Sequence, residues 1–261
     1  MIVAGIDVGS KNVHAVVIRD GEVAARASVL SGFDHEESAG RGLAEAAAAA
    51  GLVREQIEFV AATGAGRKAL SFAAEQPTEV AADARGAHAL FPGARTVIDV
   101  GADEARAIRI DDNGKVLDFA INEKCAAGAG AFVEAMSRAL EMNLEDFSRA
   151  SLDSKQSIPM NAQCTVFAES EVVSLIHENT PPADIARAVH DAMGSRVSAM
   201  VRRVGIEDPV VLGGGASLNV GFVKSLAAAL GGVDIYVLPY AEYLGAEGAA
   251  LIAWEAAQAA K

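Results

Sequence analysis

One local pattern occurs twice along this chain, and it restricts the folds that the chain can adopt. Apolar residues 2–8 and 95–100 are each expected to form a buried strand, and each strand closes on an Asp-x-Gly turn, at Asp7 and at Asp99. Two alternating segments joined by a tight turn follow each strand, which predicts a meander rather than the strand-helix-strand start of a dinucleotide-binding domain. The repetition predicts two similar α/β lobes with a cleft between them.

The spacing of apolar and turn residues predicts the remaining elements. Further strands are expected at residues 13–19, 22–30, 57–62, 105–110, 115–120, 209–212 and 233–238, and helices at 35–50, about 66–75, about 128–143, 164–178, 183–204, about 220–230 and from about 245. We place a first lobe at residues 1–92 and a second lobe, with both cysteines, at 93–245. The last helix, at about 246–261, is expected to pack back on the first lobe.

The chain carries a formal net charge of −13, which bears on the ligands that it can bind. Such an acidic chain offers no electrostatic footprint for nucleic acid, and it repels free anionic substrates. A nucleotide site therefore needs local attraction from backbone amides, helix N-termini and a metal ion. No apolar run approaches the length of a membrane span, and the first residues lack the basic segment of a signal peptide, so we expect a cytoplasmic protein outside the membrane.

The two Asp-x-Gly turns are candidate phosphate loops. A carboxylate at the carboxyl end of a buried strand points into the cleft of an α/β lobe, and a neighbouring glycine lets backbone amides approach phosphate oxygens. Asp7 and Asp99 are therefore the candidate catalytic residues, able to hold the water shell of Mg²⁺ or to orient an attacking water. One such turn is weak evidence, whereas the pair, each followed by a hairpin, is more specific.

Two further glycine-rich turns follow predicted strands. The apolar run at 210–212 leads into Gly213, Gly214 and Gly215, with Asn219 just beyond, which suits close packing against adenine or ribose better than a flexible loop. Gly64 and Arg67 lie in a strand-to-helix turn that can line the cleft, with Arg67 reaching phosphate or the other lobe. A plain glycine-rich helix start explains that second turn equally well.

The chain has two cysteines, Cys125 and Cys164, and each precedes a predicted helix. A helix N-terminus favours negative charge and lowers the pKa of a thiol. Two cysteines are too few for a four-ligand site in one chain, but a two-fold dimer brings four together, which is the complement of one iron–sulfur cluster. By counts alone, two unrelated buried thiols are the simpler interpretation.

Several motifs in this order resemble the ATPase family of benzoyl-CoA reductase and the 2-hydroxyacyl-CoA dehydratase activators. They are Asp7–Ser10, Ala62–Arg67, Thr96–Gly101, Lys124–Gly130, Cys164–Glu171, Gly213–Gly215 and Gly245–Leu251. The resemblance covers nearly the whole chain. It implies the two-lobed acetate and sugar kinase/Hsp70/actin fold, with duplicated ribonuclease H-like lobes, and ATP or ADP bound with Mg²⁺.

The resemblance also implies a redox function, and it favours the cluster over two unrelated thiols. Two subunits, as a homodimer or as a heterodimer of homologous ATPase subunits, share one [4Fe-4S] cluster through Cys125 and Cys164 of each. A ferredoxin or flavodoxin supplies the electron, and ATP hydrolysis changes the angle between the helices after the cysteines. The cluster then passes the electron on to a CoA-thioester reductase or dehydratase. The candidate nucleotide-binding residues are Gly9, Ser10, Lys11, Gly64, Arg67, Gly101, Gly128, Gly130, Gly213, Gly214, Gly215 and Asn219.

Departures from the family pattern cluster at the phosphate loops. His14 replaces a common lysine, and Lys11 stands where a small residue is usual. Ala102, Asp103 and Glu104 replace the common Gly-Gln-Asp of the second loop. These changes favour a divergent ATPase subunit of a benzoyl-CoA reductase over a homodimeric dehydratase activator. Two other classes stay open, namely a sugar-type kinase, which leaves the cysteine motifs unexplained, and a nucleotide-binding subunit without hydrolysis.

Overall fold

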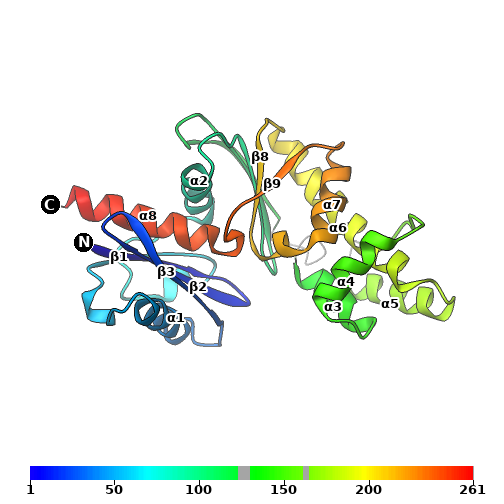
Figure 1. Ribbon diagram of the computed structural model, residues 1–261, viewed down its shortest axis with the longest axis horizontal. Coiled ribbons are helices and arrows are strands. Elements are labelled where there is room, and N and C mark those ends of the chain that lie inside the picture. Colours follow the sequence, from blue (N-terminus) through cyan, green and yellow to red (C-terminus); the bar gives the residue numbers. More distant parts are fainter. Residues whose placement is uncertain (123–129, 161–164, 261) are drawn as a thin grey trace. The chain divides into compact units, whose positions relative to one another are not determined.

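The computed structural model describes residues 1–122, 130–160 and 165–260 (Figure 1). The chain divides into two compact units. Unit 1 comprises Met1–Val97, Ile110–Leu117 and Leu238–Lys261, and unit 2 comprises Ile98–Arg109 and Asp118–Val237. The chain therefore crosses between the units several times, and the C-terminal segment belongs to the same unit as the N-terminus.

The first sheet belongs to unit 1 and has the strand order β3-β2-β1-β4. It is built from β1 (Ile2–Val8), β2 (Asn12–Arg19), β3 (Glu22–Leu30) and β4 (Phe59–Thr63). Strand β1 pairs antiparallel with β2 and parallel with β4. The turn from β2 to β3 lies at Asp20 and Gly21, with φ of 53° and 91°. Positive φ at both central residues is typical of the hairpin turn that the Asp-Gly pair predicts.

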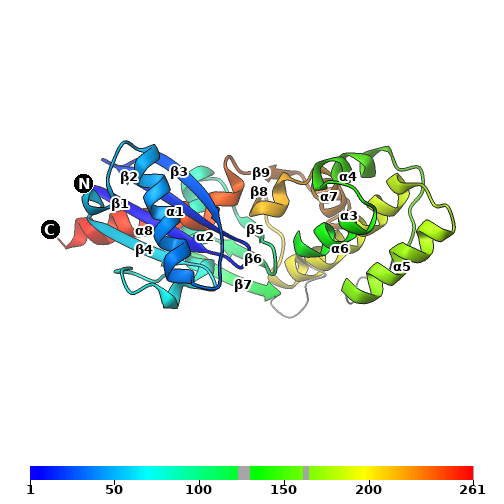
Figure 2. The same cartoon turned by 90° about the horizontal axis from the view of Figure 1, so that it is seen from below.

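Helices cover both faces of the first sheet. Helix α1 (His35–Ala49) packs on one face, where Leu43 belongs to the same apolar cluster as Val13 and Ala15, and helix α8 (Leu244–Ala259) packs on the other, in a cluster with Val16. Figure 1 shows the two helices on opposite sides of the strands, and Figure 2 looks onto α1 with the strands behind it. Because side chains alternate along a strand, odd residues of β2 face α1 and even residues face α8.

Helix α2 (Glu79–Leu90) packs against α8 through small residues. A Cβ atom at Gly86 would lie 2.7 Å from the carbonyl oxygen of Leu244, and one at Gly248 would overlap the carbonyl oxygen of Ala82. Glycine at these two positions therefore lets the helix backbones come together, as small residues do where helices cross closely.

The sequence-based prediction of a helix at about 66–75 is wrong, and α2 is the helix that it missed. A single 3₁₀ turn, Arg67–Ala69, follows Gly66, and the chain then runs beside β4, where the backbone of Glu75 accepts a hydrogen bond from Ala62. Helix α2 begins only after Pro77, with the side chain of Thr78 as its N-cap. Pairing with the edge of β4 therefore overrode the local helix propensity of this segment.

The second sheet has the order β7-β6-β5-β8-β9. Its strands are β5 (Thr96–Val100), β6 (Ala105–Ile110), β7 (Val116–Asn122), β8 (Val210–Gly213) and β9 (Ile235–Val237). Strands β8 and β9 are parallel. Strand β5, which ends at the second Asp-x-Gly turn, occupies the centre of this sheet, as β1 occupies an interior position in the first.

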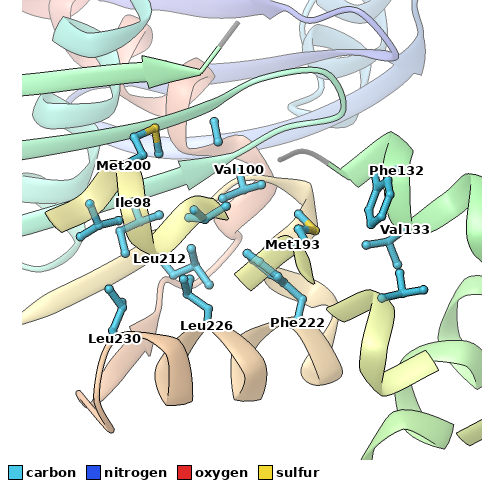
Figure 3. Packing of buried hydrophobic residues seen from close by; sticks show 14 of the residues in the cluster. Ile98, Val100, Phe132, Val133, Met193, Met200, Leu212, Phe222, Leu226 and Leu230 are labelled. Carbon is cyan, nitrogen blue, oxygen red and sulfur yellow. The ribbon is translucent and has the colours of Figure 1, made fainter. Parts of the chain in front are cut away.

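Helices pack against the second sheet through one apolar core. The described helices of unit 2 are α3 (Gly130–Ala139), α4 (Leu144–Ala150), α5 (Thr165–His177), α6 (Pro182–Val204) and α7 (Val220–Ala229). Figure 3 shows Ile98 and Leu212 of the strands facing Leu226 of α7 and Leu230, which directly follows that helix, with Met193 of α6 beside them. Within the described ranges, no helix is both long and apolar enough to cross a bilayer.

Helix α3 lies within the range of the helix expected at about 128–143, and a further helix, α4, follows that range. Helix α3 ends at Ala139, Glu141 adopts a left-handed φ of 55°, and Asn143 then caps α4 by accepting a hydrogen bond from the backbone of Asp146. Helix α4 was not predicted, because its apolar pattern extends over only seven residues. An Asn-x-x-Asp pattern at 143–146 was the available clue.

Candidate functional site

Asp7 lies in a row of three polar residues across the first sheet. It is in register with His14 of β2 on one side and with Thr63 of β4 on the other. Ala61, two residues before Thr63, packs in the α8 cluster, and Gly5, two residues before Asp7, abuts the backbone of α8. Because strand side chains alternate, all three polar side chains are on the α8 face of the sheet.

The N-terminus of α8 approaches this row at Gly245. A Cβ atom at Gly245 would lie 2.8 Å from Oδ2 of Asp7 and 3.4 Å from Oδ1 of Asp83 on α2. The carboxylates of Asp7 and Asp83 therefore converge on the first turn of α8, where the helix dipole favours negative charge. Asp83 is 1% exposed. Asp83 was not predicted as a site residue, although a carboxylate within the alanine run Ala81–Ala84 is a sign of a buried charge.

The glycine turn after β4 closes against the first loop. Gly64 has a φ of 88°, and a Cβ atom there would lie 2.5 Å from Oδ1 of Asp7. The Arg67 guanidinium donates to the carbonyl of Gly64 at 2.9 Å and to Glu79 at 3.4 Å. The structure thus places Gly64 against Asp7 and Arg67 beside the same turn. Phosphate binding by Arg67 stays a prediction.

The loop that follows β1 is held by its own backbone. The amide of Gly9 donates to the carbonyl of Asn12 at 3.1 Å, and the hydroxyl of Ser31 donates to the carbonyl of Gly9 at 2.6 Å. Ser10 and Lys11 lie between Gly9 and Asn12, at an exposed bend. Their position leaves both residues on the surface of the loop, as a contact with phosphate requires.

His14 differs chemically from the lysine common in the resembling family. Its ring makes an edge-to-face contact with Tyr243, with 5.0 Å between the ring centroids. Burial lowers the pKa of His14, and the carboxylate of Glu242 opposes that shift only in part. At neutral pH, position 14 therefore carries a neutral imidazole rather than a positive charge.

The second loop contains a buried ion-pair cluster that the sequence analysis missed. Arg106 of β6 donates to Asp99 at 2.5 Å and to Glu104 at 2.5 Å. Asp99 is 4% exposed and Arg106 is 6% exposed. Burial raises the pKa of Asp99, while the Arg106 charge opposes the shift and Glu104 adds to it. The signal was an arginine between Ala105 and Ala107 in a predicted strand.

Three glycine-rich segments meet behind the second loop. The amide of Gly130, at the start of α3, donates to the carbonyl of Gly101 at 2.8 Å, and the next amide, of Ala131, donates to Ala102 at 2.9 Å. Gly214 has a φ of 79°, and a Cβ atom there would overlap the carbonyl of Val100. The structure thus brings Gly101, Gly130 and Gly214 together, with Gly213 at the end of β8 and Gly215 next in the chain.

Asn219 has a structural role in addition to its predicted one. Its side-chain oxygen accepts hydrogen bonds from the backbone of Phe222 at 2.9 Å and from the hydroxyl of Ser148 at 2.7 Å. It is therefore the N-cap of α7 and ties that helix to α4. Contact of Asn219 with a nucleotide stays a prediction.

His190 lies in the interior of unit 2, beside Phe147 at 5.2 Å between ring centroids. Burial lowers the pKa of His190 to about 4, while the backbone of Ala186 and the charge of Asp191 oppose that shift. The folded protein binds a proton at His190 less readily than the unfolded chain does. The contribution of neutral His190 to the free energy of unfolding is therefore complete above the unfolded pKa of about 6.5, and it is lost as the pH falls towards 4.

We therefore expect the free energy of unfolding to decrease between pH 6.5 and pH 4, and His190→Leu to flatten that decrease. Urea unfolding at several pH values, compared between wild type and the variant, measures the difference. Parallel pH profiles would show that His190 is not the group that titrates.

The cysteine motifs fall mostly outside the described residues, as do Cys125, Cys164 and Gly128. Helix α5 begins at Thr165, the residue after Cys164, and α3 begins at Gly130, a short distance after Cys125. Helices α3 and α5 pack against each other. Among the residues that the structure does describe, no group of three or more His, Cys, Asp or Glu side chains converges as metal ligands do.

Comparison with known proteins decides the family. The model of the BadF/BadG/BcrA/BcrD ATPase family matches residues 4–253. The chain belongs to this family. It is 40% identical to the activator of lactoyl-CoA dehydratase from Anaerotignum propionicum over 99% of each chain. It is 33% identical to one of the subunits of benzoyl-CoA reductase from Thauera aromatica, over 96% of this chain and 92% of that one. The family expected from the motifs is confirmed.

Solved structures show the fold of this BadF/BadG/BcrA/BcrD-family ATPase. The activator of the 2-hydroxyisocaproyl-CoA dehydratase from Clostridium difficile, with bound ADPNP, superposes with a TM-score of 0.94 at 35% identity, covering 100% of this chain and 97% of that one. The ethanolamine utilization protein EutJ from Carboxydothermus hydrogenoformans gives a TM-score of 0.62 at 15% identity, covering 96% and 90%. The predicted actin-like ATPase fold, mixed α/β with two sheets, is confirmed.

Proposed function

We propose that this chain is the ATP-dependent activating subunit of an enzyme that acts on a CoA thioester. The observation that carries the proposal is the likeness, over almost the whole chain, to activators of CoA-thioester dehydratases. The two Asp-x-Gly loops at the ends of interior strands support it, because each unit then offers a carboxylate beside glycine backbone. These groups suit a nucleotide with Mg²⁺.

The nucleotide would be held by backbone and carboxylate groups rather than by a large basic patch. In unit 1, Gly64 and the first turn of α8 approach Asp7 closely, and neither position has room for a larger side chain. In unit 2, Gly214 lies against the backbone of Val100 with no room for a larger side chain, and the carbonyl of Gly101 accepts a hydrogen bond from the amide of Gly130. Asp7 suits the water shell of Mg²⁺. Asp99, paired with Arg106, suits the orientation of water better than free proton abstraction.

The redox part of the proposal rests on Cys125 and Cys164. Two subunits with two cysteines each supply the four thiolates that a [4Fe-4S] cluster requires. The cluster would supply one electron at low potential to the partner enzyme. The hydrogen bonds from the start of α3 to Gly101 and Ala102 support a coupling of nucleotide state to the helix that follows Cys125.

The partner enzyme is best proposed as a 2-hydroxyacyl-CoA dehydratase, with a homodimer of this chain and a ferredoxin or flavodoxin as donor. Identity to the lactoyl-CoA dehydratase activator exceeds identity to the homologous chain of benzoyl-CoA reductase. The altered second loop, at Ala102, Asp103 and Glu104, favours the second candidate, a benzoyl-CoA reductase ATPase subunit. Complementation of each partner enzyme, by measuring its turnover with the reduced chain and MgATP, distinguishes them.

The proposal is tested by anaerobic purification of wild type, Cys125→Ala and Cys164→Ala. Wild type should be brown, with about four iron and four sulfide per dimer, and each variant should lose the cluster while keeping ATP binding. ATP hydrolysis by wild type should be abolished in Asp99→Asn. A colourless reconstituted wild type, or phosphorylation of a hexose, would count against an electron activator and in favour of a kinase of the same fold.

A further inference from the structure

We propose that the hydroxyl of Thr63 is a further nucleotide-binding group, which donates a hydrogen bond to the terminal phosphates of ATP beside Asp7. The inference rests on the proposed nucleotide binding and extends it to a residue of the Ala62–Arg67 motif that is not among the nucleotide-binding residues expected from the sequence. It concerns unit 1 alone, where the end of β4 lies next to the end of β1.

The position of Thr63 follows from strand register. It is the last residue of β4 and pairs with Asp7 of β1, so the two Cα atoms are neighbours across parallel strands, about 4.8 Å apart. Alternation puts both side chains on the α8 face, where Gly245 already brings the α8 N-terminus against the Asp7 carboxylate. Gly64, the next residue, turns the backbone back over Asp7.

The hydroxyl is the unusual feature of this position. Thr63 is 0% exposed, and its Oγ1 makes no hydrogen bond to any residue that the structure describes. On the other side of Asp7, the buried Nδ1 of His14 likewise finds no such partner within the described ranges. Buried polar atoms are nearly always paired in folded proteins, because an unpaired one forfeits its hydrogen bonds to water.

Two polar groups that are unpaired within the described residues, on Thr63 and His14, therefore flank the candidate catalytic carboxylate of Asp7. This arrangement suits a site in which a bound ligand supplies the missing hydrogen-bond partners. A hydroxyl both donates and accepts. Beside a carboxylate that suits the water shell of Mg²⁺, the donor function matches a phosphate oxygen. A β-branched residue also has few rotamers at the end of a strand, so the hydroxyl is preorganised for that contact.

The test compares Thr63→Val, which keeps the shape and removes the hydroxyl, with Thr63→Ser, which keeps the hydroxyl and removes a methyl group. Full-length anaerobic protein is titrated with Mg²⁺ and ADPNP by calorimetry, and melting temperatures are measured without nucleotide. We expect Thr63→Val to bind about tenfold more weakly or worse while melting at or above the wild-type temperature. Thr63→Ser should melt lower yet bind nearly as wild type does.

The two variants should thus change ADPNP affinity and melting temperature in opposite ways, which distinguishes a ligand-binding hydroxyl from a structural one. If Thr63→Val binds ADPNP like wild type, or if it melts lower than Thr63→Ser, the hydroxyl serves the fold and the inference is wrong. If wild type itself does not bind ADPNP with Mg²⁺, the proposed function fails, and the role of Thr63 fails with it. Normal wild-type binding with unchanged Thr63→Val affinity overturns only the inference.

Discussion

Replacement of Arg106 by methionine should lower the free energy of unfolding by about 3–5 kcal/mol at neutral pH. Arg106 is the cation that pairs with both Asp99 and Glu104, and it is almost fully buried together with Asp99. Methionine keeps much of the volume of the side chain but leaves the Asp99 carboxylate without a counter-charge inside unit 2. Removing one partner of a buried pair costs far more than the pair itself contributes. Urea unfolding followed by circular dichroism measures the change.

The pH dependence of the Arg106→Met effect identifies its cause. Burial already raises the pKa of Asp99, and loss of Arg106 removes the main group that opposes this rise. The destabilisation should therefore shrink as the pH falls and the carboxylates become neutral. Arg106→Lys keeps the charge without the two guanidinium nitrogens that reach Asp99 and Glu104 separately, so it should cost less than methionine. A cost for Arg106→Met that stays constant from neutral to acidic pH would point to packing rather than to charge.

Replacement of Gly248 by alanine should destabilise unit 1 by about 3 kcal/mol. The new Cβ atom would overlap the carbonyl oxygen of Ala82 and lie 3.0 Å from the amide of Gly86. Both obstacles are backbone atoms of α2, so no side chain can move aside to make room. Relief requires α2 and α8 to separate, which opens the packing between these two helices. Thermal and urea unfolding both report this loss.

Gly40→Ala is the matched control for Gly248→Ala. Gly40 also lies within a helix, α1, but a Cβ atom there would meet nothing within 4 Å. Alanine should therefore stabilise the protein by about 0.5–1 kcal/mol, because it restricts the unfolded chain and favours the helix. Equal effects of the two substitutions would mean that the close approach of α2 and α8 does not determine stability.

Local chemistry was sufficient to predict those parts of the fold in which neighbouring residues decide the structure. The meander of β1, β2 and β3 follows from the alternation of apolar and polar residues and from the turn at Asp20 and Gly21. Aspartate and glycine both accept the positive φ that this turn requires. The segment 66–78 was mispredicted because the edge of β4, far away in the sequence, takes up its backbone hydrogen bonds. No periodicity within the segment carries that information.

The candidate site shows the same division. Asp7 and Asp99 could be found because a strand, a carboxylate and a glycine are consecutive in the sequence. The sequence did not allow a prediction of three further site residues, because the contacts that define them come from other elements. These residues are Thr63, Asp83 and Arg106. What the sequence does show is a polar or charged residue within an apolar run. Such a residue indicates a buried polar or charged side chain, but the sequence does not show which other residue pairs with it.

The junction between the second loop and α3 consists of main-chain atoms. The amides of Gly130 and Ala131 donate to the carbonyls of Gly101 and Ala102, and no side chain takes part in either hydrogen bond. Exchanges of side chains at Ala102, Asp103 and Glu104 consequently leave this mechanical linkage intact, whereas a proline at 130 or 131 would delete a donor. The chemistry of the loop can thus diversify during evolution while its connection to the cysteine-bearing region persists.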